Sequence, residues 1–191
     1  APVGGYYEDE IHVKIETEYT RAAEGGVGFA KAAGNYAAAL YPAKLGEAQG
    51  FRQLIWTDAK EHKYIEESGT MNIMFHIGDK LITPFTDLKT TLAGITRDSV
   101  LTLAKELGVV VEERKVSIAE VVEAIKDGTL KDAFGTGTAA TLAQISSITY
   151  NDERLELPSL DSRTLSNEIG QIIQDLKRGK VEDTHNWIYR V

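Results

Sequence analysis

The chain of 191 residues is long enough for one substantial hydrophobic core, and its 42% hydrophobic and 26% charged residues are typical of an ordinary globular protein. Its 21 basic and 29 acidic residues leave a net charge of −8, which argues against a nucleic-acid-binding surface. There is no cysteine, so disulfides, a thiolate nucleophile and a cysteine-ligated metal are excluded.

The start of the chain does not resemble a targeting signal. Its first ten residues, APVGGYYEDE, lack the basic and apolar regions of a signal peptide and predict an extended or linker segment. No apolar run reaches the length that a membrane-spanning helix needs. We therefore expect a cytoplasmic protein that binds neither membrane, nucleic acid nor metal.

Alternation and glycine mark the first third of the chain. Residues 11–21 (IHVKIETEYTR) alternate apolar and polar side chains, which predicts a strand with one solvated face. A glycine-rich stretch over 25–36 (GGVGFAKAAGNY) leads into an alanine-rich helix expected over 35–49. Pro42 removes one backbone donor from that helix, so we expect a kink there or a helix start close by.

The middle of the chain predicts a series of short strands. Residues 53–58, 64–68 and 71–77 are runs of strand length and strand composition. A Gly-Asp pair then turns the chain into a strand over 80–83, which is a hairpin signal.

Helices and strands are mixed in the second half. A helix over 96–107 closes at Gly108, and a strand over 109–116 follows. Ser117 and Glu120 form a capping box that opens the next helix. The remaining predictions are two strands around an Asn151-Asp152 turn, a long amphipathic helix and an extended end, over 145–150, 154–157, 160–178 and 186–191. This mixture, without a strict strand–helix–strand rhythm, predicts an α/β domain with a mixed, curved sheet or pseudo-barrel and helices outside.

The glycine-rich stretch does not match either common nucleotide-binding loop. A P-loop requires a hydroxyl residue directly after its lysine, whereas Ala32 follows Lys31. Gly26, Gly28 and Lys31 also miss the last glycine of a dinucleotide-binding fingerprint. Two interpretations stay open, namely glycines in a tight turn beside a surface lysine, or a lysine that does chemistry. On this segment alone the first is slightly favoured.

Three other segments suggest sites for anions or for an acidic group. Gly94, Ile95 and Thr96 lie where a helix begins, and free backbone N–H groups there attract phosphate. The segment 133–140 (AFGTGTAA) predicts a loop of exposed amides that suits a carboxylate, a phosphate or a plain tight turn. Glu67 lies in strand-like sequence just before a Ser-Gly-Thr stretch, where a solvated glutamate is the default expectation.

Together these residues form the set that pyridoxal phosphate chemistry requires. A lysine forms the Schiff base, and a carboxylate keeps the pyridine nitrogen protonated so that the ring accepts electrons. A helix terminus holds the phosphate, and a loop of amides receives the substrate carboxylate. The combination makes Lys31 and Glu67 candidates for an active site.

Four segments in this order resemble the C-terminal domain of branched-chain amino-acid aminotransferases, which are fold-type IV enzymes dependent on pyridoxal phosphate: GGVGFAKAAGNYAAAL, KEHKYIEESGTMNI, LAGITRDSV and AFGTGTAA. The resemblance covers essentially the whole chain. It implies transfer of the amino group of leucine, isoleucine or valine to 2-oxoglutarate, which gives branched 2-oxo acids and glutamate. D-Amino-acid aminotransferases and aminodeoxychorismate lyases share the fold and remain alternatives, as does a non-catalytic anion-binding domain.

The resemblance implies a role for each matched residue. Lys31 would form the Schiff base and carry the proton between substrate and cofactor. Tyr36 would hydrogen-bond the ring hydroxyl oxygen, and Glu67 would pair with the pyridinium nitrogen. The other residues would hold two anionic groups, the cofactor phosphate by Ile95, Thr96 and Thr136, and the substrate carboxylate by Thr70, Thr138 and Ala139.

The resemblance also implies a division of the chain. Residues 1–20 would be an interdomain linker with the first strand, and residues 21–191 the C-terminal cofactor-binding domain. The N-terminal domain of the family would be absent from this chain. We therefore expect that domain of the same enzyme as a partner, a homodimer, and poor activity of the C-terminal domain alone.

Overall fold

The structure is a computed structural model that describes residues 11–87 and 89–189. Its elements in chain order are β1 (Ile11–Ile15), α1 (Ala33–Ala48), β2 (Gln53–Thr57), β3 (Tyr64–Ser68), β4 (Met71–Ile77), β5 (Lys80–Pro84), α2 (Ile95–Glu106), β6 (Val110–Arg114), β7 (Val116–Ser117), α3 (Ile118–Lys126), β8 (Leu130–Gly137), β9 (Thr141–Tyr150), β10 (Glu153–Glu156), a 3-10 helix (Leu160–Ser162) and α4 (Leu165–Lys177). Within these residues, no helix combines the length and apolar character needed to cross a membrane.

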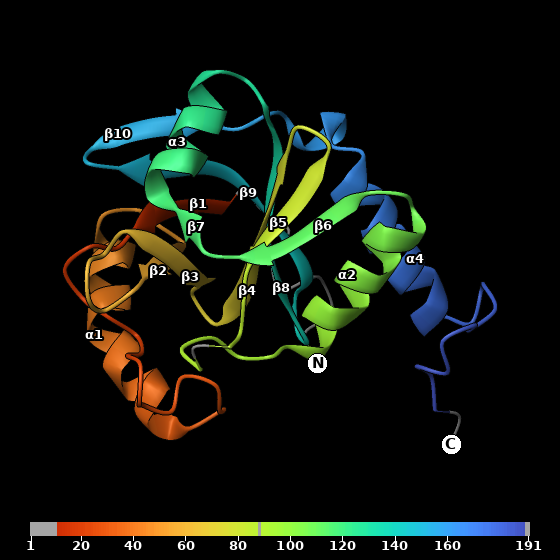
Figure 1. Ribbon diagram of the computed structural model, residues 1–191, viewed down its shortest axis with the longest axis horizontal. Helices are drawn as coiled ribbons and strands as arrows, with labels where there is room; N and C mark the ends of the chain where they lie inside the picture. Colours follow the sequence, from red (N-terminus) through yellow and green to blue (C-terminus); the bar gives the residue numbers. More distant parts are fainter. Residues whose placement is uncertain (1–10, 88, 190–191) are drawn as a thin grey trace.

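A closed ring of strands forms the centre of the molecule (Figure 1). Its order is β4–β8–β9–β1–β2–β3, and a short pairing between β3 and β4 closes it. β1 runs parallel to both of its neighbours, whereas the other pairs in the ring are antiparallel. β5 and β6 extend the sheet from β4, while β7 and β10 pair with β3 and β9. The predicted mixed α/β architecture is confirmed, and its sheet closes as a pseudo-barrel.

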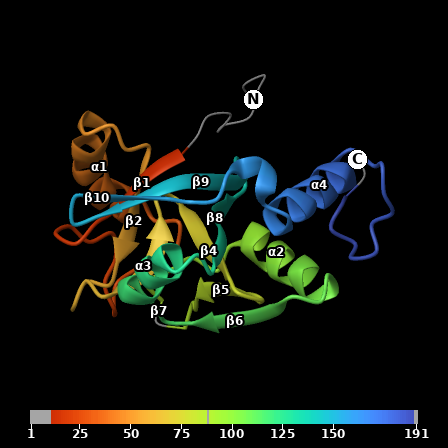
Figure 2. The same cartoon turned by 90° about the horizontal axis from the view of Figure 1, so that it is seen from above.

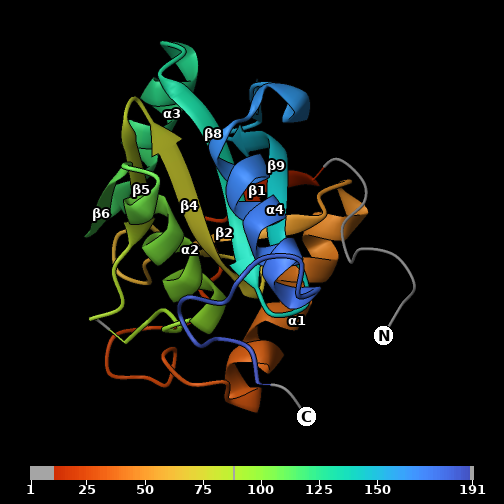
Figure 3. The same cartoon turned by 90° about the vertical axis from the view of Figure 1, so that its right-hand side faces the viewer.

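Two hydrophobic clusters lie on opposite faces of the strands, because successive side chains of a strand point to opposite sides. The first cluster joins buried side chains from every strand of the ring and from α3. The second packs α2 and α4 against β4, β5 and β8. In β4, Ile73 and Phe75 belong to the first cluster and Met74 to the second. Figures 2 and 3 show α2 and α4 side by side against the ring, with α1 apart from them.

Helix α1 packs on β2 through one close contact. A Cβ on Gly46 would lie 2.9 Å from Leu54 Cδ2, so glycine lets the two elements approach this closely. The helix begins at Ala33 and continues past Pro42 to Ala48, so a helix start near Pro42 is wrong. Pro42 is one of the few buried residues of α1, although it cannot donate a backbone hydrogen bond within the helix.

The first strand is shorter than the alternation of the sequence predicts. It ends at Ile15, because the carboxylate of Glu16 accepts hydrogen bonds from the backbone N–H groups of Glu18 (2.7 Å) and Tyr19 (3.1 Å). These bonds turn the chain out of the sheet. The expected linker before the strand, residues 1–10, lies outside the described residues.

The long C-terminal helix is divided in the structure. Arg163 has an extended backbone, with φ −83° and ψ 115°, between the 3-10 helix and α4. Its side chain turns inward to a buried partner, Asp132, and this burial interrupts the helix. The strand predicted over 109–116 is likewise divided into β6 and β7. Residues 186–189 contain no strand, and the last two residues lie outside the described part.

The capping box and both hairpin signals are confirmed. Ser117 Oγ accepts a 3.1 Å hydrogen bond from the Glu120 N–H at the start of α3. β4 and β5 pair as a hairpin around Gly78, which has φ +60°. β9 and β10 pair around Asn151 and Asp152, whose φ values of 48° and 63° fit the tight turn that suits a hairpin.

Candidate active site

Four connecting segments meet at one end of the strand ring. They are the glycine-rich loop before α1, the turn between β3 and β4, the loop into α2, and the turn between β8 and β9. The first, third and fourth lie toward the lower end of the ring in Figure 3. The residues that the sequence marks as candidates lie in these segments or in the adjoining ends of the helices and strands that they connect.

Lys31 and Glu67 line the same small pocket of about 30 Å³. Tyr36, from the first turn of α1, and Thr70, from the β3–β4 turn, also line it. Lys31 is exposed and forms no hydrogen bond or ion pair with any other described residue. Its amine is therefore free to react with a ligand that enters the pocket.

Glu67 is the buried acid of this site and is only 4% exposed. Its Oε1 accepts a 2.7 Å hydrogen bond from the backbone N–H of Leu92, and its Oε2 lies 3.3 Å from Arg21 Nε. Burial raises the pKa of this carboxyl to about 7, although Arg21 and the Leu92 N–H favour the ionised form. Glu67 is therefore not the solvated glutamate that its sequence position alone predicts. It is suited to pair with a buried N–H⁺ group.

No sequence pattern points to Arg21, yet this residue holds Glu67 in place. Its side chain is 9% exposed, and its guanidinium pairs with Glu67 and donates a hydrogen bond to the carbonyl of Thr90. Glu67 and Thr90 are distant from Arg21 in the sequence. Only the closed ring brings them together, so the arginine carries no local signal.

Asn35 closes the glycine-rich loop on itself. Its Nδ2 donates hydrogen bonds of 2.9 Å to the carbonyls of both Val27 and Ala30, and the side chain is buried. A Cβ on Gly28 would lie 2.5 Å from the carbonyl oxygen of Thr90, so the loop packs directly on the segment that binds Glu67. The asparagine directly after the last glycine of the stretch is the sequence signal that could have predicted this hydrogen-bonded loop closure.

Asn72 links Glu67 to the start of α2. Its Nδ2 donates a 2.7 Å hydrogen bond to the carbonyl of Leu92, and it pairs with Glu67 across the β3–β4 hairpin. A Cβ on Gly94 would lie 2.2 Å from Asn72 Oδ1, which explains the glycine at the N-cap. The predicted helix start at Gly94, Ile95 and Thr96 is confirmed. No side chain caps it, so the N–H groups of its first turn remain available to an anion.

Thr136 lies next to this helix start. It pairs with Asn72 across β4 and β8, and it is 2% exposed. Its hydroxyl has no hydrogen-bond partner among the described residues. A buried hydroxyl without a partner requires an explanation, and a ligand bound at the N-terminus of α2 would provide one.

The segment 133–140 is not the loop that the sequence predicts. Most of it is the end of β8, and only 138–140 form a turn before β9. The reason is tertiary: a Cβ on Gly135 would lie 2.8 Å from Met71 Cε, so its glycine serves close packing between strands. Thr138 and Ala139 are exposed in the turn. The β4–β8 register, continued by two residues beyond the Asn72–Thr136 pair, leads from Thr138 toward Thr70.

A larger cavity of about 330 Å³ lies outside this site. Glu66, Asp58 and Lys115 are among its lining residues, whereas Lys31 and Glu67 are not. In the described ranges, no group of three or more histidine or acidic residues could hold a metal ion. The chemistry therefore centres on the smaller pocket.

The sequence matches known proteins along its whole length. Residues 14–148 match the family model for amino-transferase class IV. The chain is 41% identical over 194 aligned residues to branched-chain-amino-acid aminotransferase 2 of Bacillus subtilis, covering 100% of this chain and 53% of the relative. It is 40% identical over 191 aligned residues to a probable branched-chain-amino-acid aminotransferase of Staphylococcus aureus, covering 98% and 53%. The chain thus spans about half the length of these relatives.

Solved structures show the same fold. The branched-chain amino acid aminotransferase of Escherichia coli superposes with a TM-score of 0.80 at 27% identity, covering 96% of this chain and 57% of that one. The branched-chain amino acid aminotransferase of Thermobaculum terrenum, in its pyridoxal phosphate form, gives a TM-score of 0.77 at 26% identity, covering 95% and 55%.

Proposed function

Because this chain belongs to the class IV aminotransferases, we propose that it is the cofactor-binding part of a branched-chain amino-acid aminotransferase. The enzyme would transfer the amino group of leucine, isoleucine or valine to 2-oxoglutarate. The observation that carries this proposal is the pocket that brings together Lys31, Tyr36 and the buried Glu67. The names of the relatives support branched-chain substrates over D-amino acids or aminodeoxychorismate.

The described residues fit pyridoxal phosphate, the cofactor of class IV aminotransferases. The orphaned hydroxyl of Thr136 and the uncapped amides of Ile95 and Thr96 would hold the phosphate. Glu67 would receive the protonated ring nitrogen, and Tyr36 would hydrogen-bond the ring hydroxyl oxygen. When bound, the cofactor supplies an electron sink for the bonds around the substrate α-carbon.

Lys31 would be the covalent anchor and the proton carrier. It lies on the loop that Asn35 closes, so its backbone is held at the pocket while its side chain stays free. A neutral amine beside the substrate can remove the proton from the α-carbon and pass it to the cofactor. Glu67 would remain ionised opposite the pyridinium, because this second positive charge, added to that of Arg21, would offset the burial that raises the pKa of the carboxyl.

Thr70, Thr138 and Ala139 would bind the substrate carboxylate. The exposure of the 138–140 turn and the β4–β8 register support this assignment. The site also needs apolar walls for a branched side chain. We assign them to an N-terminal domain of the same enzyme, so residues 21–191 would act as one domain of two.

An exposed apolar face on α1 supports a partner at this surface. Leu40 and Tyr41 are 64% and 62% exposed, and Leu45 is exposed beside them. We assign this face to contacts in a homodimer of the two-domain enzyme. Sedimentation of the two-domain enzyme tests the dimer, and imaging of a tagged enzyme tests the cytoplasmic location that we also propose.

The site assignment is tested by covalent labelling of the lysine that reacts with pyridoxal phosphate. The protein is mixed with pyridoxal phosphate, reduced with borohydride and mapped by peptide mass, and we expect the label on Lys31. Lys31→Arg should abolish it, whereas Lys44→Arg, which changes an exposed lysine in α1, should retain it. A label at any other lysine, or none, would overturn the assignment.

A second experiment tests the reaction. The two-domain enzyme should transaminate leucine with 2-oxoglutarate, and residues 21–191 alone should be poorly active because we assign the apolar walls of the pocket to the N-terminal domain. Strong activity with D-alanine or aminodeoxychorismate in place of leucine would favour the related enzymes of the same fold.

A further inference from the structure

The first residue of β9 has an unusual backbone. Thr141 has φ +60°, in the left-handed region that β-branched residues rarely adopt. It follows the turn at 138–140 and pairs with Gly137 across the hairpin. The left-handed position after a short hairpin turn usually carries glycine. A threonine stays there only if the surrounding structure holds it.

Lys177 supplies that restraint. It is the last residue of α4, and its Nζ donates a 2.6 Å hydrogen bond to Thr141 Oγ1. Thr141 is 5% exposed, so its hydroxyl is shielded from water. Among residues 11–87 and 89–189, no carboxylate lies within 4.0 Å of Lys177 Nζ. Partial burial lowers the pKa of this ammonium group, with no acidic neighbour to raise it.

The restrained residue directly follows the turn assigned to the substrate carboxylate. Thr141 joins the turn to β9, so its backbone conformation sets the orientation of the turn. It therefore also sets the direction in which the N–H groups of Thr138 and Ala139 point. An ammonium group without an acidic partner also leaves a positive charge beside this turn.

We propose that Thr141 and Lys177 are positioning residues for the carboxylate of the substrate. Their hydrogen bond fixes the 138–140 turn, and the unpaired charge of Lys177 attracts an anion toward it. This inference rests on the proposed function, because it requires that the turn binds a carboxylate.

The test compares two ligands of the two-domain enzyme loaded with pyridoxal phosphate. They are 4-methyl-2-oxopentanoate and 4-methylpentan-2-one, in which a methyl group replaces the carboxylate. Lys177→Met should raise the Kd of the oxo acid about five- to tenfold and leave that of the ketone unchanged, as measured by calorimetry. The KM for leucine should rise by a similar factor with kcat within about twofold, as expected for loss of uniform binding.

Matched variants distinguish a specific loss of carboxylate binding from a general loss of protein structure. Lys177→Arg keeps the charge and the donor and should restore most of the affinity. Thr141→Val removes only the hydroxyl and should reproduce the loss for the oxo acid. Lys180→Met changes a nearby lysine that pairs with Asp175 and should have no effect.

Two outcomes would overturn the inference: an unchanged Kd of the oxo acid in Lys177→Met, or an equal loss for both ligands. Borohydride labelling of Lys31 separates the two proposals. Failure of the unsubstituted enzyme to label at Lys31 counts against the proposed function. Normal labelling with unchanged affinity in Lys177→Met counts against the inference alone.

Discussion

At the scale of single residues, the burial of Glu67 links the stability of the protein to pH. Its pKa is about 7 in the folded protein, against an ordinary value of 4.5 for a glutamate. Between these values the folded state holds a proton that the unfolded state has released. The free energy of unfolding of the cofactor-free protein therefore falls as the pH rises through this range. We expect Glu67→Gln to remove most of that fall, which is on the order of 2–3 kcal/mol between pH 5 and pH 8.

Urea denaturation at the two pH values measures this effect. Glu61→Gln alters an exposed glutamate in the loop before β3 and should keep the original pH dependence. If Glu67→Gln and the unsubstituted protein show the same difference between pH 5 and pH 8, the pKa of Glu67 is not raised by folding.

Asn35 is expected to matter for both stability and chemistry. Asn35→Ala removes two hydrogen bonds and leaves the carbonyls of Val27 and Ala30 without this partner. We expect a loss of about 1–3 kcal/mol in the free energy of unfolding. Borohydride labelling of Lys31 should also slow, because the loop that carries it loses its closure. Asn167→Ala, which removes a hydrogen-bonding asparagine exposed on α4, should leave the labelling rate unchanged.

The residues of the site divide by how far their partners lie along the chain. Lys31 and Glu67 stand in motifs that mark them in the sequence, and the structure brings both to one pocket. Arg21 and Asn72 act through partners on other segments, which only the folded ring brings near. The burial of Glu67 was missed for the same reason, because a strand that ends in a polar turn is usually solvated.

At the scale of elements, the glycines of the first loop have different tasks. Gly28 packs against the carbonyl of Thr90 and the side chain of Ala22, whereas a Cβ on Gly34 would meet nothing within 4 Å. Gly28→Ala must therefore displace backbone, and we expect a loss of about 1–3 kcal/mol. Gly34→Ala lies in the first turn of α1 and should be neutral or stabilise by up to about 1 kcal/mol. Thermal unfolding of both variants tests the contrast, and equal effects would contradict the close packing of Gly28.

Local signals predicted the starts of elements better than their extents. The cap at Ser117 and the Asn151-Asp152 turn depend on neighbours in sequence, and both are confirmed. The segment 133–140 depends instead on pairing with β4, and it became a strand end where an amide loop was expected. The length of a strand depends on which other strands it pairs with, and the local sequence does not show this pairing.

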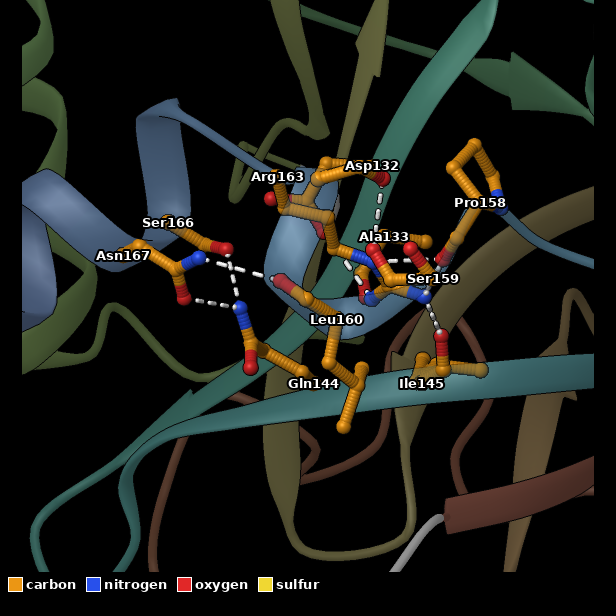
Figure 4. Close-up of polar contacts among 11 residues, drawn as sticks. Asp132, Ala133, Gln144, Ile145, Pro158, Ser159, Leu160, Arg163, Ser166 and Asn167 are labelled. Carbon is orange, nitrogen blue, oxygen red and sulfur yellow. Dashed lines mark hydrogen bonds and ion pairs between the residues drawn. The ribbon is translucent and has the colours of Figure 1, made fainter.

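At the scale of the whole molecule, one buried cation ties the C-terminal part of the chain to the ring (Figure 4). Arg163 and Asp132 have side chains that are 0% and 1% exposed, and they form an ion pair of 3.1 Å. The guanidinium also donates hydrogen bonds to the carbonyls of Ile145 (2.7 Å) and Pro158 (2.8 Å). It therefore joins β8, β9 and the segment before α4. Neither the closing of the ring nor this long-range tie has a sequence signature, although the mixed α/β class was predictable.

Because the Arg163–Asp132 pair is buried, removing only one of its two charges should strongly destabilise the protein. Burial raises the pKa of Asp132 and lowers that of Arg163, so each charge depends on the other. Arg163→Met leaves Asp132 without its cation, and we expect a loss of about 3–5 kcal/mol in the free energy of unfolding. Arg154→Met breaks an exposed pair with Glu156 and should cost about 1 kcal/mol or less.

The double variant Arg163→Met with Asp132→Leu tests what causes the loss of stability in Arg163→Met. The cause is either the unpaired carboxylate of Asp132 or the loss of the hydrogen bonds that the guanidinium donates. If the unpaired carboxylate causes the loss, removing it should recover a large part of the stability, because two apolar side chains can fill the space. If the hydrogen bonds to Ile145 and Pro158 carry the tie, the double variant should be as unstable as Arg163→Met alone. Urea denaturation at pH 7 distinguishes the two, and we expect the recovery, since burial acts against both charges.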